Sequence, residues 1–147
     1  YDMSQFYGKS VRDFANEQRP EGGITEIAPF TGIADRGYGD DSGPLGWELA
    51  FPYLQQNLYQ YYGDKEIIAS NYEAFKKQLD FLGSKSLQGL FFWDISDHEA
   101  LDPRPEAFTA GAFYYHHARL AEEFAGIFDG FSISSIYNFR FTSINYA

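Results

Sequence analysis

Apolar residues recur at steps of three and four along four stretches of the chain, with polar residues between them. This spacing places the apolar side chains on one face of a helix, so each stretch predicts an amphipathic α-helix. Glycine and proline residues separate the stretches from one another. The four predicted helices span about residues 3–18, 46–62, 64–82 and 109–128.

Single residues refine the ends of these helices. Pro52 is tolerated only in a first turn, so the second helix is expected to start near Glu48 or Leu49. Gly83 is expected to stop the third helix, and Thr109 is a suitable N-cap for the fourth.

The connection between the second and third helices consists of two residues. Gly63 suits the left-handed position that follows a helix, and Asp64 can cap the next helix at once. Two helices joined so tightly must pack antiparallel. The sequence therefore predicts a helical hairpin over residues 48–82.

Two long segments, residues 21–46 and 89–106, lack helical spacing and are rich in glycine or proline. Structureless loops of this length are uncommon in compact domains and are usually functional. Both segments carry an excess of carboxylates. These are Glu21, Glu26, Asp35, Asp40 and Asp41 in the first, and Asp94, Asp97, Glu99, Asp102 and Glu106 in the second.

The order loop, helix, helix, loop, helix predicts a mainly α fold built of antiparallel helical hairpins with long loops. In an α-toroid, such loops emerge at one end and present a sugar-binding face. Helical repeats that bind proteins would produce the same pattern, so both architectures stay open at this point.

Residues 131–147 differ from the rest of the chain. They hold no acidic residue, and their apolar residues alternate instead of recurring at helical steps. β-branched and aromatic residues at this density favour an extended segment. We expect residues 1–130 to form one helical domain, which is a partial toroid in the first of these two architectures, and residues 131–147 to form an atypical tail that covers an open flank of the helices.

Charge and composition narrow the classes of ligand. The net charge is −10, which disfavours nucleic acid and anionic membrane surfaces as partners. Aromatic residues make up 20% of the chain and either fill a core or line a surface for ring-shaped ligands. Neutral glycans suit such an aromatic, carboxylate-rich surface.

Other features of the sequence exclude whole classes of chemistry. The chain has no Cys, which excludes disulfides, thiol nucleophiles and Cys-bound zinc. No apolar run reaches the length of a membrane helix, and the N-terminus does not look like a signal peptide. The first residue is not Met, so we expect an internal fragment of a longer protein, whose compartment the sequence leaves open.

Several side chains are candidates for chemistry. Glycoside hydrolysis needs two carboxyl groups at the scissile bond, and Asp97-His98-Glu99 is the densest cluster of polar candidates. Residues 98–102 lack the second His of a zinc-peptidase helix. We expect neither a metal nor a cofactor. Trp47 and Trp93 lie beside the loops, where an indole either stacks on a sugar ring or seals the core.

Three segments follow one another over residues 3–130: a helix leading into NEQRPEGGITEIAP, then GPLGWELAFPYLQQNLYQYYGD, then DHEALDPRPEAFTAGAFYYHHARLAEEFAGI. In this order and spacing they resemble the catalytic domain of the bacterial α-L-rhamnosidases, inverting glycoside hydrolases built as six-hairpin α-toroids. The third segment is similar to a branch of that family with Asp-His in place of Asp-Trp.

The resemblance implies substrate contacts, with an α-L-rhamnoside or a related glycan as the partner. Trp47 matches the Trp that lines the rhamnose pocket, and Asp97 and His98 match the pair at the pocket rim. Glu99 neighbours that rim. Arg36, Asp40 and Asp41 lie in the loop that would face the pocket.

The resemblance also implies that these 147 residues hold no catalytic residue. The family's general acid lies in an upstream stretch that opens Asp-Cys-Pro, and its general base lies on a later hairpin. Open apolar flanks on the helices lead us to expect a homo-oligomer. The alternative is a non-catalytic helical module that binds a carbohydrate or a protein.

Overall fold

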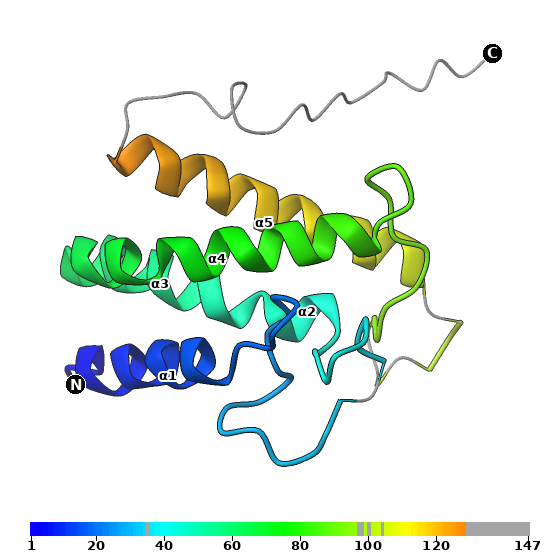
Figure 1. Cartoon of the computed structure of the whole chain (residues 1–147), viewed down its shortest axis with the longest axis horizontal. Helices are drawn as coiled ribbons and strands as arrows, with labels where there is room; N and C mark the ends of the chain where they lie inside the picture. Colours follow the sequence, from blue (N-terminus) through cyan, green and yellow to red (C-terminus); the bar gives the residue numbers. More distant parts are fainter. Residues whose placement is uncertain (35, 97–98, 100, 104, 129–147) are drawn as a thin grey trace.

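The computed structural model describes residues 1–34, 36–96, 99, 101–103 and 105–128. Within this part the chain forms four long helices and one short helical turn, and no strand (Figure 1). An isolated bridge pairs Leu87 with Leu90. The helices are α1 (Ser4–Glu17), α2 (Leu45–Glu48), α3 (Ala50–Tyr62), α4 (Lys65–Lys85) and α5 (Glu106–Phe128).

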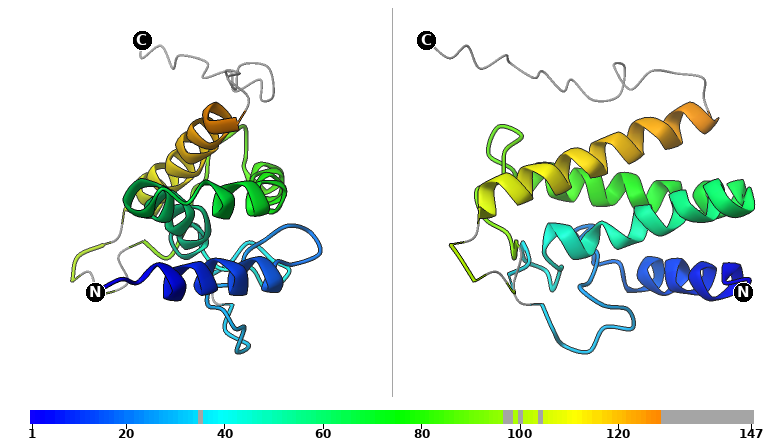
Figure 2. Two further views of the ribbon diagram at one scale, coloured as in Figure 1. Left: turned by 90° about the vertical axis from the view of Figure 1, so that its left-hand side faces the viewer. Right: turned by 180° about the vertical axis from the view of Figure 1, so that it is seen from behind.

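The predicted hairpin is confirmed. Gly63 has a φ of 69° and ends α3, and the side chain of Asp64 accepts a hydrogen bond of 3.0 Å from the backbone N–H of Ile67 in the first turn of α4. Helices α3 and α4 lie antiparallel and side by side in every view (Figures 1 and 2). Two local residues therefore suffice to reverse the chain.

Two expected boundaries were wrong. Gly83 does not stop α4, which continues to Lys85, because Gly83 keeps a helical backbone. Helix α5 starts at Glu106 directly after Pro105. Thr109 is therefore not an N-cap, and its hydroxyl bonds back to the carbonyls of Pro105 and Glu106.

The helix expected from about residue 48 also differs from the structure. It is preceded by the separate turn α2, and Leu49 lies between α2 and α3. Pro52 has no N–H to give to the carbonyl of Glu48, so the ladder of helical hydrogen bonds is interrupted at this point.

Aromatic and aliphatic side chains from α1, α3, α4 and α5 form the main core. Its centre is occupied by three fully buried rings, Phe51, Phe75 and Phe124, and the last two meet edge to face at 5.4 Å. A second cluster around Leu45, Phe81 and Phe91 lies below the loops. Helix α1 contributes Val11 to the main core, whereas Phe6 stays exposed.

The two long loops lie at the same end of the molecule. The first loop, residues 18–44, leads from α1 to α2, and the second loop, residues 86–105, leads from α4 to α5. Both are at the right of Figure 1, and the rear view of Figure 2 agrees. The N-terminus and the α3–α4 turn lie at the opposite end. The expected arrangement of hairpins with loops at one face is thus observed.

Among the described residues, the helices are too short or too polar to cross a bilayer. The predicted tail, residues 131–147, lies outside the described part of the chain, so its extended conformation stays a prediction.

Candidate functional site

The short turn α2 presents Trp47 at the loop end of the molecule. The indole is 41% exposed, whereas its neighbours Leu45 and Glu48 are buried. Gly46 lies against the ring of Phe113, and a Cβ at this position would come within 2.9 Å of that ring. Glycine therefore lets the turn pack closely on α5 while the Trp side chain stays at the surface.

The carbonyl that Pro52 leaves without a helical donor is satisfied from another helix. The side-chain Nε2 of Gln78 on α4 donates to the backbone oxygen of Glu48 at 3.0 Å and to its carboxylate Oε2 at 3.2 Å. The backbone N–H of Ile24 in the first loop donates to the same Oε2 at 3.2 Å. Glu48 thus joins α2, α4 and the first loop inside the protein.

The carboxyl group of Glu48 is unusual for its burial. Its side chain has no exposed surface, and this burial raises the pKa of Glu48 to about 8, although the bonds from Ile24 and Gln78 work in the opposite direction. At neutral pH the group is therefore mostly protonated. A neutral acid can remain in the core without an ionic partner.

A second buried carboxyl, Asp94, ties the second loop to α2. Its Oδ1 accepts a hydrogen bond of 3.1 Å from the backbone N–H of Leu45, the first residue of the turn. Burial raises the pKa of Asp94, whereas backbone donors, including Ile95 and Leu45, lower it. Asp94 caps a helical turn that lies 49 residues away in the sequence.

The two loops are also connected at the surface. The guanidinium of Arg36 donates to the carboxylate of Glu106 at 2.8 Å and to the backbone oxygen of Asp94 at 3.4 Å. The hydroxyl of Tyr38 donates to the backbone oxygen of Trp93. The first loop therefore holds the segment 93–94 from the outside while Asp94 reaches inward.

The structure separates the predicted site residues of the first loop. Arg36 contacts the second loop, as described above. Asp40 accepts a hydrogen bond of 3.0 Å from the backbone N–H of Glu21, and Asp41 lies 3.6 Å from the guanidinium of Arg19. Asp40 and Asp41 thus fasten the first loop to the segment that leaves α1.

In the second loop, Glu99 is exposed to solvent. Asp97 and His98 lie outside the described residues, so their expected place at a pocket rim stays a prediction. The pocket that the resemblance implies for Trp47, Asp97 and His98 together also stays a prediction.

The two adjacent histidines of α5 have different surroundings. His117 is fully buried, its Nδ1 lies 2.9 Å from the carbonyl of Phe113, and burial lowers its pKa to about 4. His116 meets the ring of Tyr53 edge to face at 5.8 Å. No group of three or more potential metal ligands occurs in the described part of the chain.

Glu48 is not among the site residues predicted from the sequence, and Asp94 is predicted only as one loop carboxylate among many. Each had a signal in the sequence. Glu48 is the single charged residue in the apolar run LGWELAFP, and Asp94 directly follows the run LFFW. An acid inside an apolar run indicates a buried carboxyl with fixed partners.

Comparison with known proteins identifies relatives of this arrangement. The family model described as bacterial alpha-L-rhamnosidase 6 hairpin glycosidase domain matches residues 1–147. No curated protein sequence matches the chain. The solved structure of an alpha-L-rhamnosidase from Dictyoglumus thermophilum is similar, with a TM-score of 0.74 and 26% identity. The match covers 86% of this chain and 14% of that one.

Proposed function

Because the chain belongs to the family of bacterial alpha-L-rhamnosidase six-hairpin glycosidase domains, we propose that it forms part of the rhamnose-binding face of such an enzyme. The substrate class is an α-L-rhamnoside or a related glycan. The chain's own role is to contact the sugar, and it supplies neither the general acid nor the general base.

The proposal rests on the way in which hydrogen bonds hold the turn that bears Trp47. A half-exposed indole at the loop end lies on a turn that buried carboxyls hold from both sides, through Asp94 and Glu48. An indole face stacks on the apolar C–H face of a sugar ring, and its N–H can reach a hydroxyl. A rigid mount lowers the entropy that binding would otherwise lose.

The other site residues take supporting roles in the proposal. Asp97, His98 and Glu99 contribute polar groups at the rim, where carboxylates and imidazole bond sugar hydroxyls. Arg36 joins the first loop to α5 through Glu106 and to the second loop through the backbone oxygen of Asp94. Asp40 and Asp41 shape the first loop through the contacts with Glu21 and Arg19, and we propose that they face the sugar less directly.

Binding of L-rhamnose to the 147-residue chain tests the proposal. We expect the indole N–H signal of Trp47 in an NMR spectrum to shift in titrations with L-rhamnose but not with D-rhamnose, its enantiomer. In the variants, which lack this indole, the backbone amide signals around position 47 serve as the readout. Trp47→Ala should abolish their saturable response to L-rhamnose, and Trp47→Phe should retain part of it. Equal responses to both enantiomers, or none to either, would overturn the proposal.

A second measurement tests the absence of catalysis. We expect hydrolysis of an aryl α-L-rhamnoside by the chain to stay at the level of buffer, because inverting hydrolysis needs a positioned acid and base. Clear turnover that Asp97→Asn or Glu99→Gln abolishes would show that the second loop is catalytic.

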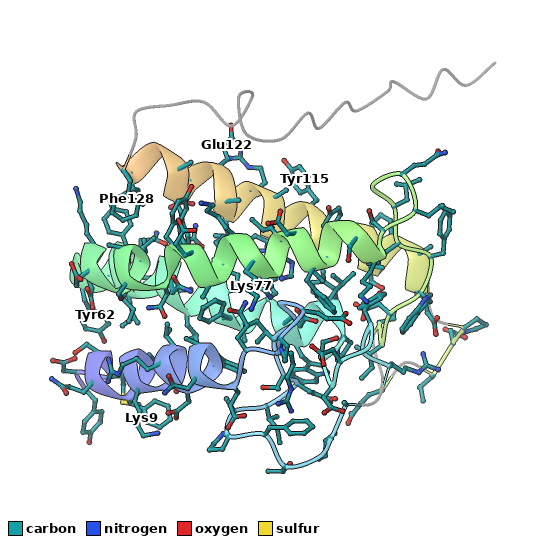
Figure 3. All side chains as sticks on the ribbon, in the orientation of Figure 1. Lys9, Tyr62, Lys77, Tyr115, Glu122 and Phe128 are labelled. Atoms are coloured by element: carbon teal, nitrogen blue, oxygen red, sulfur yellow. The ribbon has the colours of Figure 1, made fainter. Side chains whose placement is uncertain are left out.

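One observation favours the alternative, a helical module that binds a protein. A hollow of about 470 Å³ between α1 and α3 is lined by Tyr7, Tyr53, Leu54, Asn57, Leu58, Tyr61 and Tyr62. Figure 3 shows Tyr62 at the end of the molecule where α1 begins, and the Tyr62 hydroxyl accepts a hydrogen bond of 3.2 Å from the backbone N–H of Met3. If rhamnose does not bind but Tyr61→Glu changes the oligomeric state, the hypothesis that the chain is a protein-binding module is favoured.

A further inference from the structure

The second tryptophan of the chain is exposed to the same degree as the first. Trp93 in the second loop is 40% exposed, close to the 41% of Trp47. A Trp that seals a core would be largely covered, and this one leaves much of its surface to solvent. The indole of Trp93 therefore has surface left for contact with a ligand.

A series of ring contacts connects Trp93 to the core. Its ring lies 4.5 Å from that of Tyr38 at an angle of 30°. Tyr38 meets Phe91 edge to face at 4.9 Å, and Phe91 meets Tyr114 of α5 at 4.9 Å. The buried rings of Phe91 and Tyr114 thus support an exposed indole.

The backbone of Trp93 is held as well as its ring. The hydroxyl of Tyr38 donates to the backbone oxygen of Trp93. The next residue, Asp94, is buried and bonds the backbone N–H of Leu45, two residues before Trp47. With about 3.8 Å between consecutive Cα atoms and the reach of the Asp94 side chain, this bond keeps the Cα atoms of Trp47 and Trp93 within roughly 20 Å.

We propose that Trp93 is a second carbohydrate-contacting platform, which stacks on the group linked to rhamnose through its glycosidic oxygen. The inference rests on the proposed function, in which Trp47 contacts the rhamnose ring itself. The linked group is a second sugar ring or a planar aromatic aglycone, because both present a flat, neutral face to an indole. The excess of carboxylates in both loops disfavours an anionic group at this position.

The experiment compares two rhamnosides that differ only in the linked group. The chain has two Trp residues, so its NMR spectrum holds two indole N–H signals, which Trp47→Phe and Trp93→Phe assign. Methyl α-L-rhamnoside should shift the Trp47 signal alone. The p-nitrophenyl α-L-rhamnoside should shift both signals and bind more tightly.

Variants give the quantitative test. Trp93→Ala should weaken binding of the aryl rhamnoside about fivefold and leave the methyl rhamnoside unchanged, because one aromatic contact is lost. Trp93→Phe should recover most of the affinity. Phe92→Ala is the matched control, since Phe92 is the neighbouring exposed aromatic residue at 59% exposure. It should change neither affinity. Circular dichroism of each variant verifies the fold.

The outcomes separate this inference from the proposed function. The inference about Trp93 is wrong if the aryl rhamnoside shifts the Trp47 signal but not the Trp93 signal. It is also wrong if Trp93→Ala and Phe92→Ala weaken binding equally. In both cases the proposed rhamnose site at Trp47 is unaffected. A Trp93 signal that already shifts with the methyl rhamnoside overturns the assignment of Trp93 to the linked group. If neither signal responds to either rhamnoside, both proposals fall.

Discussion

Both ends of the molecule reverse the chain between helices, but they do so in different ways. At the turn end, Gly63 takes a left-handed backbone and Asp64 caps α4, so two adjacent residues complete the connection. At the loop end, two long loops are held by contacts between residues far apart in the sequence, with Asp94 and Glu48 buried among them.

The backbone shows the same contrast. Among the described residues, every non-glycine residue with a left-handed backbone lies in one of the two loops. These residues are Arg36, Asp40, Asp41, Gln88 and Ser96. A left-handed non-glycine residue is strained by about 1 kcal/mol or more and persists only where its surroundings hold it. The loop end therefore keeps strained residues in place through long-range contacts, whereas the turn end reverses the chain with local residues alone.

Removing a ring from the core should have the largest effect. Phe75 is fully buried and meets Phe124, so Phe75→Ala leaves a cavity that its neighbours fill only in part. We expect a loss of about 3–5 kcal/mol in the free energy of unfolding. Urea denaturation measures it. A loss below about 1 kcal/mol would mean that the core around α4 and α5 is not close-packed.

Raising the pH should destabilise the loop end. The pKa of Glu48 is raised from 4.5 to about 8 on folding, so the folded state binds the proton more tightly and stability falls as pH rises through this range. The pKa of His117 is lowered from 6.5 to about 4 on folding, so the folded state binds this proton less tightly than the unfolded state. The free energy of unfolding therefore falls as the pH falls through that range.

These two effects oppose each other below pH 6.5, and only the Glu48 effect remains between pH 6.5 and about 8. We expect the free energy of unfolding to drop by about 2 kcal/mol over that interval, at roughly 1.4 kcal/mol per pH unit. Glu48→Gln should remove the slope, since the amide does not titrate. An unchanged slope in Glu48→Gln would assign the effect to another group.

Loss of the Asp94 carboxyl should loosen α2. Asp94→Ala leaves the buried N–H of Leu45 without its acceptor, which costs about 2 kcal/mol. Asp94→Asn keeps a carbonyl oxygen at this position and should lose less. Hydrogen exchange at the Leu45 amide locates the change. Exchange that is equally slow in the wild type and in Asp94→Ala would contradict the role of this bond.

The smallest effect is expected at the turn end. Gly63→Ala has open space for its Cβ, so only the left-handed backbone opposes the change, by about 1 kcal/mol. Gly126→Ala, also with open space but inside α5, should instead stabilise by about 0.5–1 kcal/mol. Thermal unfolding of both variants gives the two signs. If both changes have the same sign, backbone conformation is not the cause.

Local patterns predicted the parts of the fold that local physics controls. The helical spacing and the Gly63-Asp64 connection placed the hairpin correctly, because a two-residue turn leaves few other geometries. The helix ends predicted at Gly83 and Thr109 were wrong because residues elsewhere in the fold or the chain decide them. A glycine can remain inside a helix that packing holds, and α5 already begins at Glu106, ahead of Thr109.

The sequence by itself determined that the chain is helical and acidic, that long loops connect its helices, and which family it resembles. The tertiary structure alone decided how the site is held. Pro52 removes a local donor from the carbonyl of Glu48, and Gln78 supplies one from 30 residues away. Asp94 caps a turn 49 residues before it. Such partners are chosen by which buried polar groups meet in the folded core, and no local pattern in the chain encodes that meeting.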